Sequence, residues 1–343
     1  MTAPCSDYSM GGLEGPPNPP TLGGVPAKPG HPSTTAPNPP TLGGVPAKPG
    51  HPSILRQALG AALAVVVALW LAAATPAHAQ PYAGPLMDAH SHLSGPKVID
   101  AYVDAMRDHK VSRVIILGVG GVQREDSAWI AAAARKYPRS VVPGVPVPNP
   151  DAPDAASNLD AEITRTKARI VGEVHVRQPS RKIDRDPSSE VFTKLFEVAA
   201  RQLTPVVIHD ELDDAAGAKL EKALATNRKA TIILAHAGET TPARLEPLLQ
   251  KNPNLFVDLS GMHFERKPSL ATETGPIDPA FKALIEKMPE RFLMGIDVWS
   301  PKLFQPEMLD RLMRWTRRIL GELKPEVAER VAFKNTAGLL HLN

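Results

Sequence analysis

The side chains of this chain best suited to chemistry are histidines and carboxylates that end apolar runs. His90 and His92 lie two positions apart in MDAHSH, so in an extended segment both imidazoles point to the same side. The run PVVIH ends in His209, ILAH ends in His236, and MGID ends in Asp297. Several neutral imidazoles with one carboxylate make a ligand set for a divalent metal ion, typically zinc.

Each of these histidines taken alone fits a loop or a hydrogen-bonded core position equally well. Together they are harder to explain by packing, because buried imidazoles and carboxylates cost free energy unless they are paired. Glu173 and His175 add a further pair two positions apart, in GEVH. The single cysteine of the chain is Cys5, near the N-terminus. A metal site in the rest of the chain must therefore be built from histidine and carboxylate, without a thiol.

The segments that must position these residues alternate between short β-branched runs and longer stretches of helical period. The short runs, such as RVIILGV and TIILAH, are apolar throughout, which is typical of parallel strands covered by helices. Strands are predicted at 85–92, 113–119, 140–147, 168–176, 205–209, 230–236, 255–260 and 291–297. Helices are predicted at 96–109, 124–136, 152–166, 188–202, 213–225, 241–251, 278–288 and 306–320.

Eight such units in about 260 residues predict a single-domain α/β fold, a (β/α)8 TIM barrel over 80–343. In such a barrel the chemistry lies at the C-terminal ends of the strands, which is where the histidines and carboxylates fall. A doubly wound sheet is the alternative, but no G-x-G-x-x-G turn follows the first predicted strand.

Residues 1–53 differ in composition from the rest of the chain. The segment PNPPTLGGVPAKPGHPS occurs at 17–33 and again at 37–53, a repeat with a period of 20 residues. Pro- and Gly-rich copies of this kind cannot bury enough apolar surface to offset the entropy of ordering. A stacked repeat fold also needs about three copies. We therefore expect 1–53 to be disordered, either as a linker or as a region upstream of the true start codon.

Residues 54–79 have the form of a signal peptide. Arg56 precedes an apolar stretch at 58–74, and Ala-His-Ala at 77–79 makes a small-x-small cleavage site before Gln80. A transmembrane anchor is the alternative, because about 17 apolar residues is the lower limit for spanning a bilayer. The sequence thus predicts an exported protein, periplasmic or secreted, which is membrane-anchored if 58–74 is not cleaved.

The overall charge balance restricts the class of partner. The formal net charge is +3, and aromatic residues make up 5% of the chain. Near-neutral charge with few stacking aromatics argues against a nucleic-acid surface. We expect a small-molecule substrate, no nucleic acid, and membrane contact only through the leader segment. The sequence is also compatible with an oligomer.

The ordered strand-end residues resemble those of the amidohydrolase superfamily, in particular its amidohydrolase-related branch. The resemblance covers 85–342 and rests on MDAHSH, GEVH, PVVIH, ILAHAG, NLFVDLSG and RFLMGIDVW in this order. The closing FKNTAGLLHL is similar to the terminal helix of the family. The branch includes lactone hydrolases and decarboxylases of the aminocarboxymuconate-semialdehyde type. The His-x-His pair is weak by itself, whereas the ordered set is specific.

The resemblance implies one set of metal ligands, His90, His92, His209 and Asp297. It implies that His236 polarises the substrate, moves a proton or binds a second metal ion. The fourth strand lacks the lysine that some members carbamylate, and Glu173 stands near that position. Glu173 could bridge two metal ions, as in TatD-like nucleases, or hydrogen-bond to the ligands. We expect one divalent ion, zinc first and manganese second, and leave a second metal site open.

The expected activity is hydrolysis of a small-molecule lactone, ester or amide by a metal-bound hydroxide. Asp297 would take the proton of the attacking water, and His236 would stabilise the oxyanion or protonate the leaving group. A metal-dependent non-oxidative decarboxylase on the same scaffold is the alternative, because it shares these ligands. A TatD-like nuclease and a non-catalytic periplasmic binding protein rank lower. Binding alone does not require metal-type residues at so many strand ends.

Two loops on the same predicted face carry candidates for substrate binding. Arg177 and Arg181 follow the fourth strand, and His263 and Arg266 lie in a long segment after the seventh. We expect one of these arginines to bind an anionic group such as a carboxylate. The alternative is a set of solvated loop charges. His175 points inward from the fourth strand, where it could contact the substrate or serve packing.

Overall fold

The computed structural model describes residues 80–119 and 126–342. The predictions for 1–53 and 54–79 lie outside these ranges and stay predictions. The described residues belong to one compact unit, Pro76–Asn343. Within the described ranges, no helix combines the length and the apolarity needed to cross a membrane.

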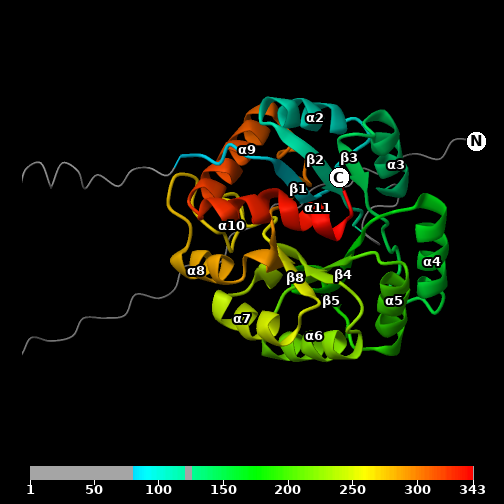
Figure 1. Ribbon diagram of the computed structural model, residues 1–343. Coiled ribbons are helices and arrows are strands. Elements are labelled where there is room, and N and C mark those ends of the chain that lie inside the picture. The colour runs from blue at the N-terminus through cyan, green and yellow to red at the C-terminus, as the bar shows by residue number, and fades with distance from the viewer. Residues whose placement is uncertain (1–79, 120–125, 343) are drawn as a thin grey trace, which may run out of the picture. The chain divides into compact units, whose positions relative to one another are not determined.

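Nine strands of the described part form two sheets, in which only the β4–β5 pairing is antiparallel (Figure 1). The order is β1-β2-β3 in one sheet and β5-β4-β6-β7-β8-β9 in the other. Helices connect the successive parallel strands, as parallel pairing requires. The strands are β1 (Leu86–Ser91), β2 (Val111–Ile116), β3 (Val141–Pro143), β4 (Val171–Gln178), β5 (Ile183–Asp184), β6 (Val206–Asp210), β7 (Ile232–Leu234), β8 (Leu255–Asp258) and β9 (Phe292–Leu293).

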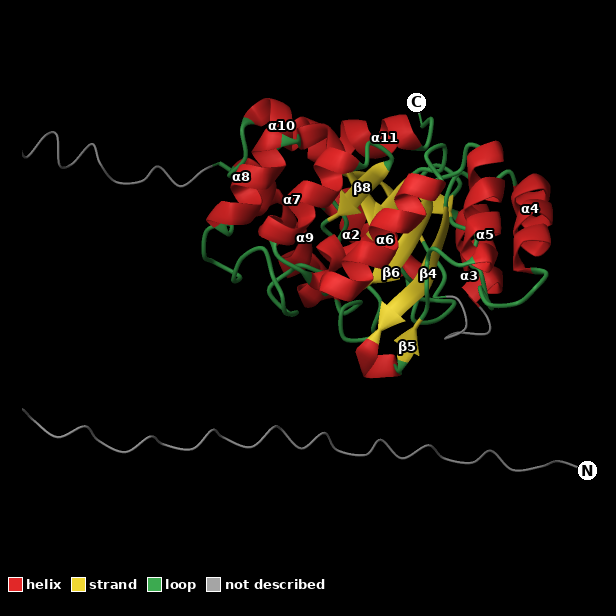
Figure 2. Cartoon of the chain, turned by 90° about the horizontal axis from the view of Figure 1, so that it is seen from below, coloured by secondary structure: helices red, strands yellow, loops and turns green. Residues whose placement is uncertain are grey.

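The helices lie around the strands and each buries one apolar side against them (Figure 2). Ser189, Asp213 and Asp278 begin three of them, because their side chains accept hydrogen bonds from N–H groups of the first turn. The helices are α2 (Ile99–Asp108), α3 (Asp126–Lys136), α4 (Ala155–Thr166), α5 (Glu190–Arg201), α6 (Asp214–Thr226), α7 (Pro242–Lys251), α8 (Pro279–Lys287), α9 (Pro306–Gly321), α10 (Pro325–Glu329) and α11 (Asn335–Leu339).

Each strand and helix expected from the sequence has a counterpart, with differences mainly at the ends. The short hairpin strand β5 was not expected. Strands β3 and β9 are shorter than predicted, with three and two residues. Pro143, Pro146 and Pro148 shorten β3, because proline has no N–H to donate to a neighbouring strand.

The two sheets approach each other at both edges without forming one continuous ladder. At one edge Val145 makes an isolated parallel bridge with Val171. At the other, the N–H of Ala89 donates to the carbonyl of Met294 (2.9 Å). Asp297 has φ of +61°, so the chain after β9 leaves strand geometry there. The structure therefore shows an α/β fold of parallel strands, and the predicted closed barrel is not completed by strand pairing.

Two apolar layers explain why the strands are apolar throughout. Val114 and Ile116 belong to the large core that also contains the helix residues. Ile115 and Leu117 belong to a second cluster, which includes Leu340 near the C-terminus. Successive residues of a strand thus enter opposite apolar layers, and a polar side chain is tolerated mainly where a strand ends.

Asp88 fastens β1 to the segment after β9. Its carboxylate is fully buried and accepts hydrogen bonds from Ser91 Oγ (2.5 Å) and Tyr102 Oη (2.5 Å). It also accepts from the N–H groups of His90 (3.1 Å) and Ile296 (2.7 Å). Burial raises the pKa of Asp88 to about 6 in spite of these hydrogen bonds. One carboxylate therefore joins β1, α2 and the segment that leads to Asp297.

We expect Asp88→Asn to lower the free energy of unfolding by about 2–3 kcal/mol, because its amide NH2 would face hydrogen-bond donors. Tyr102→Phe removes one donor and leaves the carboxylate in place, so it should cost only about 1 kcal/mol. Urea unfolding followed by circular dichroism measures both changes. Equal losses for the two variants would contradict the role given to Asp88.

Candidate metal centre

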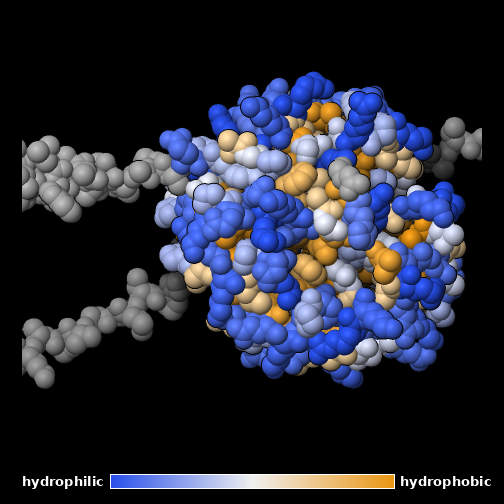
Figure 3. Space-filling view, in the orientation of Figure 1, coloured by the Kyte–Doolittle hydropathy of each residue, from blue (hydrophilic) through white to orange (hydrophobic). Residues whose placement is uncertain are grey.

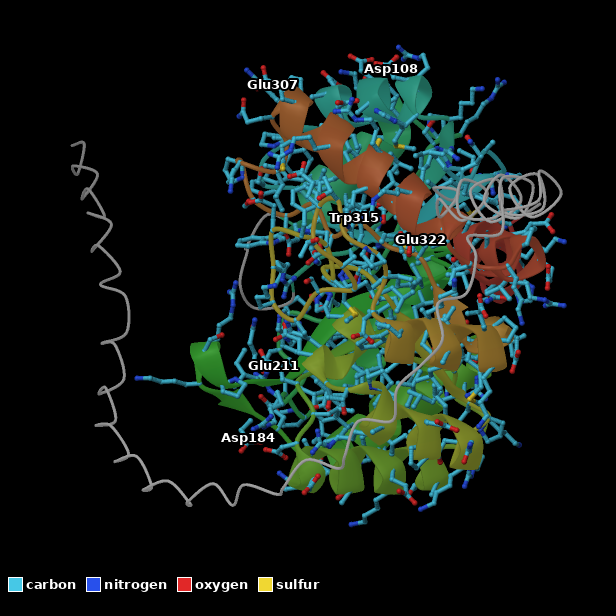
Figure 4. The ribbon with its side chains drawn as sticks, turned by 90° about the vertical axis from the view of Figure 1, so that its left-hand side faces the viewer. Asp108, Asp184, Glu211, Glu307, Trp315 and Glu322 are labelled. Carbon is cyan, nitrogen blue, oxygen red and sulfur yellow. The ribbon has the colours of Figure 1, made fainter. Side chains whose placement is uncertain are left out.

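The strand-end residues singled out in the sequence gather at the C-terminal ends of the parallel strands. In Figure 2 the strands run toward the end of the molecule that carries β5, away from the C-terminus. Figure 4 shows Glu211 and Asp184 at this end and Glu322 at the opposite one. The site therefore lies where parallel α/β folds place their chemistry.

Glu173, on β4, lies at the centre of a group of imidazoles. Its Oε1 is 3.0 Å from Nδ1 of His209 and 3.2 Å from Nε2 of His236. Its Oε2 is 3.6 Å from Nε2 of His92 and 3.9 Å from Nε2 of His90. All five side chains are buried. The sequence placed Glu173 beside the proposed ligands, and in the structure its carboxylate contacts three of these histidines and His236.

The two histidines of β1 direct their Nε2 atoms at one place. These atoms are 3.0 Å apart. Nδ1 of His90 donates to Asp258 Oδ2 (2.9 Å), and Nδ1 of His92 donates to the carbonyl of Leu117 (2.9 Å). In the neutral form of each ring the proton therefore lies on Nδ1, and the Nε2 lone pairs converge. Asp297 Oδ1 is 3.5 Å from Nε2 of His92. Converging lone pairs beside a carboxylate fit a cation.

Asp258, at the end of β8, positions two of the histidines. Besides its bond to His90, its Oδ1 accepts from the N–H of His236 (3.1 Å). Nδ1 of His236 donates to the carbonyl of Ser260 (2.9 Å), which turns Nε2 toward Glu173. Metal-ligating histidines commonly donate their second ring N–H to a carboxylate or a carbonyl in this way. Sequence reasoning missed Asp258, although it stands in the conspicuous run NLFVDLSG.

The cluster holds charges of both signs. Burial disfavours the ionised form of Glu173, but His209 and His90 outweigh burial and hold its pKa well below its usual range. Burial also opposes protonation of the histidines. Nevertheless, Asp258 and Glu173 raise the pKa of His90 to about 9, and Glu173 raises that of His209 to about 10. The buried carboxylates thus require positive charge beside them, which protons on the imidazoles or a metal ion can supply.

The donor atoms fit a divalent cation. In each of three fully buried groups the possible ligand atoms lie within 4.8 Å of one another. These groups are His90 with Glu173 and His236, His90 with His92 and Asp297, and Glu173 with His175 and His209. They share members, so they form one cluster rather than separate sites. Imidazole nitrogen and carboxylate oxygen are the usual donors of protein zinc sites, and both donor types also suit manganese.

His175, a member of the cluster, and His263, beside it, are buried and neutral. Burial lowers the pKa of both His175 and His263 to about 4. Nδ1 of His175 and Nε2 of His263 have no hydrogen-bond partner among the described residues. The ring of His175 stacks on that of His209 with centroids 4.8 Å apart. Buried ring nitrogens without partners call for an explanation, and a bound ligand provides one.

Arg266 forms ion pairs with carboxylates of the protein itself. Its guanidinium pairs with Asp297 and with Glu239, the latter at 2.8 Å. Glu239 was not expected at the site. It comes directly after a tight turn at residues 236–238, which the sequence does not indicate. Arg266 therefore orients Asp297, and its predicted contact with an anionic ligand stays a prediction.

Arg177 lies near the C-terminal end of β4 and Arg181 in the turn that follows, where its charge, in addition to burial, contributes to the lowered pKa of His175. Arg177 donates to the carbonyl of Glu211 and pairs with Asp213 at 2.7 Å. Arg181 is exposed in the turn between β4 and β5. Glu211, also unexpected, places its Oε1 3.4 Å from Nε2 of His209. A carboxylate there can hold the ring of His209 with Nδ1 directed at Glu173.

Gly261 allows the chain to pass close to the cluster. Its φ is +67°, and a Cβ atom there would lie 2.8 Å from Oδ2 of Asp297 and 2.9 Å from Nδ1 of His236. The side chain of Arg266 occupies the same space. Both the backbone conformation and the contacts therefore restrict this position to glycine.

The sequence matches a family model described as Amidohydrolase over residues 87–342. A comparison with curated proteins gave no match.

Solved structures resemble this one over most of the chain. A TIM-barrel protein from Bordetella bronchiseptica is 14% identical with a TM-score of 0.56, covering 76% of this chain and 99% of that one. The 5-carboxyvanillate decarboxylase from Sphingomonas paucimobilis is 14% identical with a TM-score of 0.53 and the same coverage. A dihydroxybenzoic acid decarboxylase from a Polaromonas species, with bound manganese and 2-nitroresorcinol, is 13% identical with a TM-score of 0.52, covering 76% and 98%. At these identities the likeness shows the fold alone.

We expect Gly261→Ala to weaken zinc binding by about tenfold or more, because the new methyl group would displace Asp297 and His236. Gly217→Ala is the matched control, since nothing lies within 4 Å of a Cβ atom at that position of α6. That change should leave zinc affinity unaltered and stabilise the fold by about 0.5–1 kcal/mol. Competition with a fluorescent chelator measures the affinities, and equal affinities in both variants would refute the argument.

Zinc binding should release about one to two protons per ion at pH 7, because the raised pKa values keep His90 and His209 protonated until a cation replaces the protons. The affinity should therefore rise with pH between about 6 and 8. Calorimetry in buffers of different ionisation enthalpy counts the protons. Binding without proton release would show that these imidazoles are not displaced by the metal ion.

Proposed function

The chain belongs to the amidohydrolase family, and from this premise we propose that it is a metal-dependent hydrolase of a small-molecule lactone, ester or amide. The observation that carries the proposal is the convergence of buried imidazoles on Glu173 and Asp297 at the strand ends. We also propose that the two sheets act as one eight-stranded barrel. The bridge at Val145 and the hydrogen bonds between β1 and residues 294–298 support this.

We assign the metal ion to ligands that converge in the cluster: His90, His92, His209 and Asp297, with Glu173 as a further ligand or a hydrogen-bond acceptor. A divalent ion held there would lower the pKa of a water molecule to about 7 and polarise a carbonyl oxygen. Zinc is our first assignment, because imidazole nitrogen is the prevailing donor. Manganese is the second.

Asp297 is the proposed proton acceptor. Burial disfavours its ionised form, but His236 and Arg266 outweigh burial and lower its pKa. Asp297 is therefore a carboxylate at neutral pH, able to take a proton from an attacking water. Arg266 holds Oδ2, whereas Oδ1 faces His92 across 3.5 Å. Each oxygen thus has a fixed direction, which general-base catalysis requires.

His236 is proposed to act on the substrate oxygen. Because Nδ1 lies 2.9 Å from the carbonyl of Ser260, Nε2 is the ring nitrogen that faces Glu173 Oε1, at 3.2 Å, and the rest of the cluster. A proton gained on Nε2 can be donated to the developing oxyanion or to the leaving group.

We assign substrate binding to groups around the cluster. His175 and His263 offer unused ring nitrogens as neutral hydrogen-bonding groups. Arg177 and Arg266 are the nearby cations that could bind an anionic part of the substrate. To do so, either guanidinium would have to give up a hydrogen bond to an acceptor group of the protein and donate to the substrate instead. Substitution of both by alanine tests this, because an unchanged KM for a carboxylate substrate would exclude them.

Non-oxidative decarboxylation is the alternative. Two solved structures that share the fold are described as decarboxylases of aromatic acids, one of them with manganese. The same cluster could serve either reaction, since both place a metal ion beside a carbonyl or carboxylate group of the substrate.

Asp297→Asn should lower kcat by about 10²–10⁴-fold, because the amide cannot accept the proton. It should retain more metal than His90→Ala, which should lose metal and activity together. Asp310→Asn on α9, where the carboxylate pairs with His109 at 3.0 Å, is a matched control with expected wild-type activity. Full activity of a metal-free His90→Ala protein would end the metal hypothesis.

A substrate panel distinguishes the two reactions. We expect metal-loaded protein to release acid from lactones or esters in a pH-stat assay, or free amine from amides in a fluorescamine assay, with no carbon dioxide. Release of carbon dioxide from aromatic acids without hydrolysis of any panel member would replace the hydrolase by the decarboxylase.

A further inference from the structure

The face opposite the metal centre carries an excess of positive charge. It is formed by the loops that lead from each helix into the next parallel strand, which all lie at the same end of the strands. Figure 3 views the molecule from this end and shows apolar side chains among hydrophilic ones. The basic residues of these loops are Lys110, Arg139, Lys167, Arg169, Arg228, Lys229 and the buried Arg291, against one acidic loop residue, Glu290. The C-terminal segment on the same face adds three basic residues, Lys324, Arg330 and Lys334, and three acidic ones, Glu322, Glu326 and Glu329, so the excess comes from the loops.

Three of these basic side chains are exposed without a carboxylate partner in the described part of the chain: Arg139, Lys167 and Lys229. Basic side chains in the last turn of a helix are stabilised by the helix dipole, so they need no other anionic partner. These three lie beyond the last helical residue of α3, α4 and α6. Their charge is therefore free to attract an anionic partner.

A hollow of about 340 Å³ on this face has a lining suited to an anion. Among the described residues, its charged or titratable lining residues are Arg113, Arg139, Lys167, Arg169 and His341, and no carboxylate side chain of that part of the chain lines it. Arg169 is fixed, because its guanidinium donates to the carbonyls of Leu340 (2.9 Å) and His341 (2.6 Å). Guanidinium groups match the oxygens of a phosphate in geometry as well as in charge.

Leu203 adds an apolar element to the same face. Its side chain is 76% exposed and lines an adjoining hollow together with Lys229 and His341. Its φ is +53°, a conformation that is costly for leucine. A large apolar side chain is thus held outward beside Lys229, where it can contact a partner surface.

The chain enters the described structure on this face. The N–H of Tyr82 donates to the carbonyl of Arg317 (2.8 Å), near the end of α9. The guanidinium of Arg317 in turn donates to the carbonyl of His109, beside the loop that carries Lys110. The apolar run at 58–74 comes shortly before this point in the sequence.

We propose that this face binds the surface of a membrane rich in anionic glycerophospholipids. A headgroup phosphate occupies the hollow between Arg139, Lys167 and Arg169, and Leu203 inserts among the headgroups. Attraction between basic side chains and anionic lipids is strong within about 10 Å of the surface and is screened by salt. The metal centre, at the opposite ends of the strands, stays directed to the solution. This proposal does not depend on the reaction.

Vesicle sedimentation of the full chain tests the proposal. We expect binding to vesicles containing phosphatidylglycerol to exceed binding to pure phosphatidylcholine by about tenfold or more at 0.1 M NaCl, and to weaken strongly at 0.5 M. The triple variant Arg139→Glu, Lys167→Glu, Lys229→Glu should lose this preference. Lys97→Glu, Lys182→Glu, Lys222→Glu makes the same change in charge elsewhere and should keep it. The run at 58–74 is identical in all proteins, so the differences report on the face.

Leu203→Asn provides a second test that does not change the charge, since asparagine tolerates a positive φ. It should weaken binding several-fold at both salt concentrations. Equal binding to both lipids, or full binding by the triple variant, would overturn the proposal. Glycerol 1-phosphate at millimolar concentration should not release the protein from vesicles. Its saturable binding to the hollow, with no lipid preference, would show a site for a free phosphate ester instead.

Discussion

The buried charge of Glu173 is the constraint on which the rest of the site depends. A carboxylate withdrawn from water is costly unless opposite charge and hydrogen-bond donors surround it. His209 at 3.0 Å, on β6, and His236 at 3.2 Å, just after β7, lie against it. The positive charge beside Glu173 must come from protons on His209 and His90 or from a cation. An arrangement that costs free energy to fold without positive charge is suited to a divalent ion, whose binding would be coupled to the loss of those protons.

The surrounding structure keeps these side chains from turning away from one another. Asp258 holds His90 through Nδ1 and His236 through its N–H, so one carboxylate on β8 aligns groups from two other segments. Asp88 ties β1 to the segment that ends in Asp297, at the edge where strand pairing is incomplete. Gly261 leaves room for the close approach of Asp297 and His236. Such outer contacts commonly change metal affinity by about 10–100-fold when removed.

Much of this could be predicted from the sequence, because it depends on local pattern. The two-residue spacing of His90 and His92 fixes the side of the strand, and apolar runs fix the strands themselves. The roles of Asp258 and Arg266 could not be predicted in this way. Asp258 meets His90 across 168 positions of sequence, and Arg266 meets Asp297 across 31, so both contacts depend on strand order and loop path. The gap between the sheets depends on prolines around β3. Their effect on strand pairing depends on which strand lies beside β3, and that is set by the tertiary structure.

The metal content of the full chain and of Glu173→Gln tests the central claim most directly. Both proteins would be dialysed against zinc buffered by a chelator at the lowest free concentration that saturates the wild-type protein, and then analysed by inductively coupled plasma mass spectrometry, with thermal melts to confirm folding. The account predicts about one equivalent or more in the wild-type protein and at least about a tenfold lower affinity in Glu173→Gln, which keeps the shape of the side chain and removes its charge. A metal-free wild-type protein, or a folded Glu173→Gln protein that retains its full metal content, would contradict it.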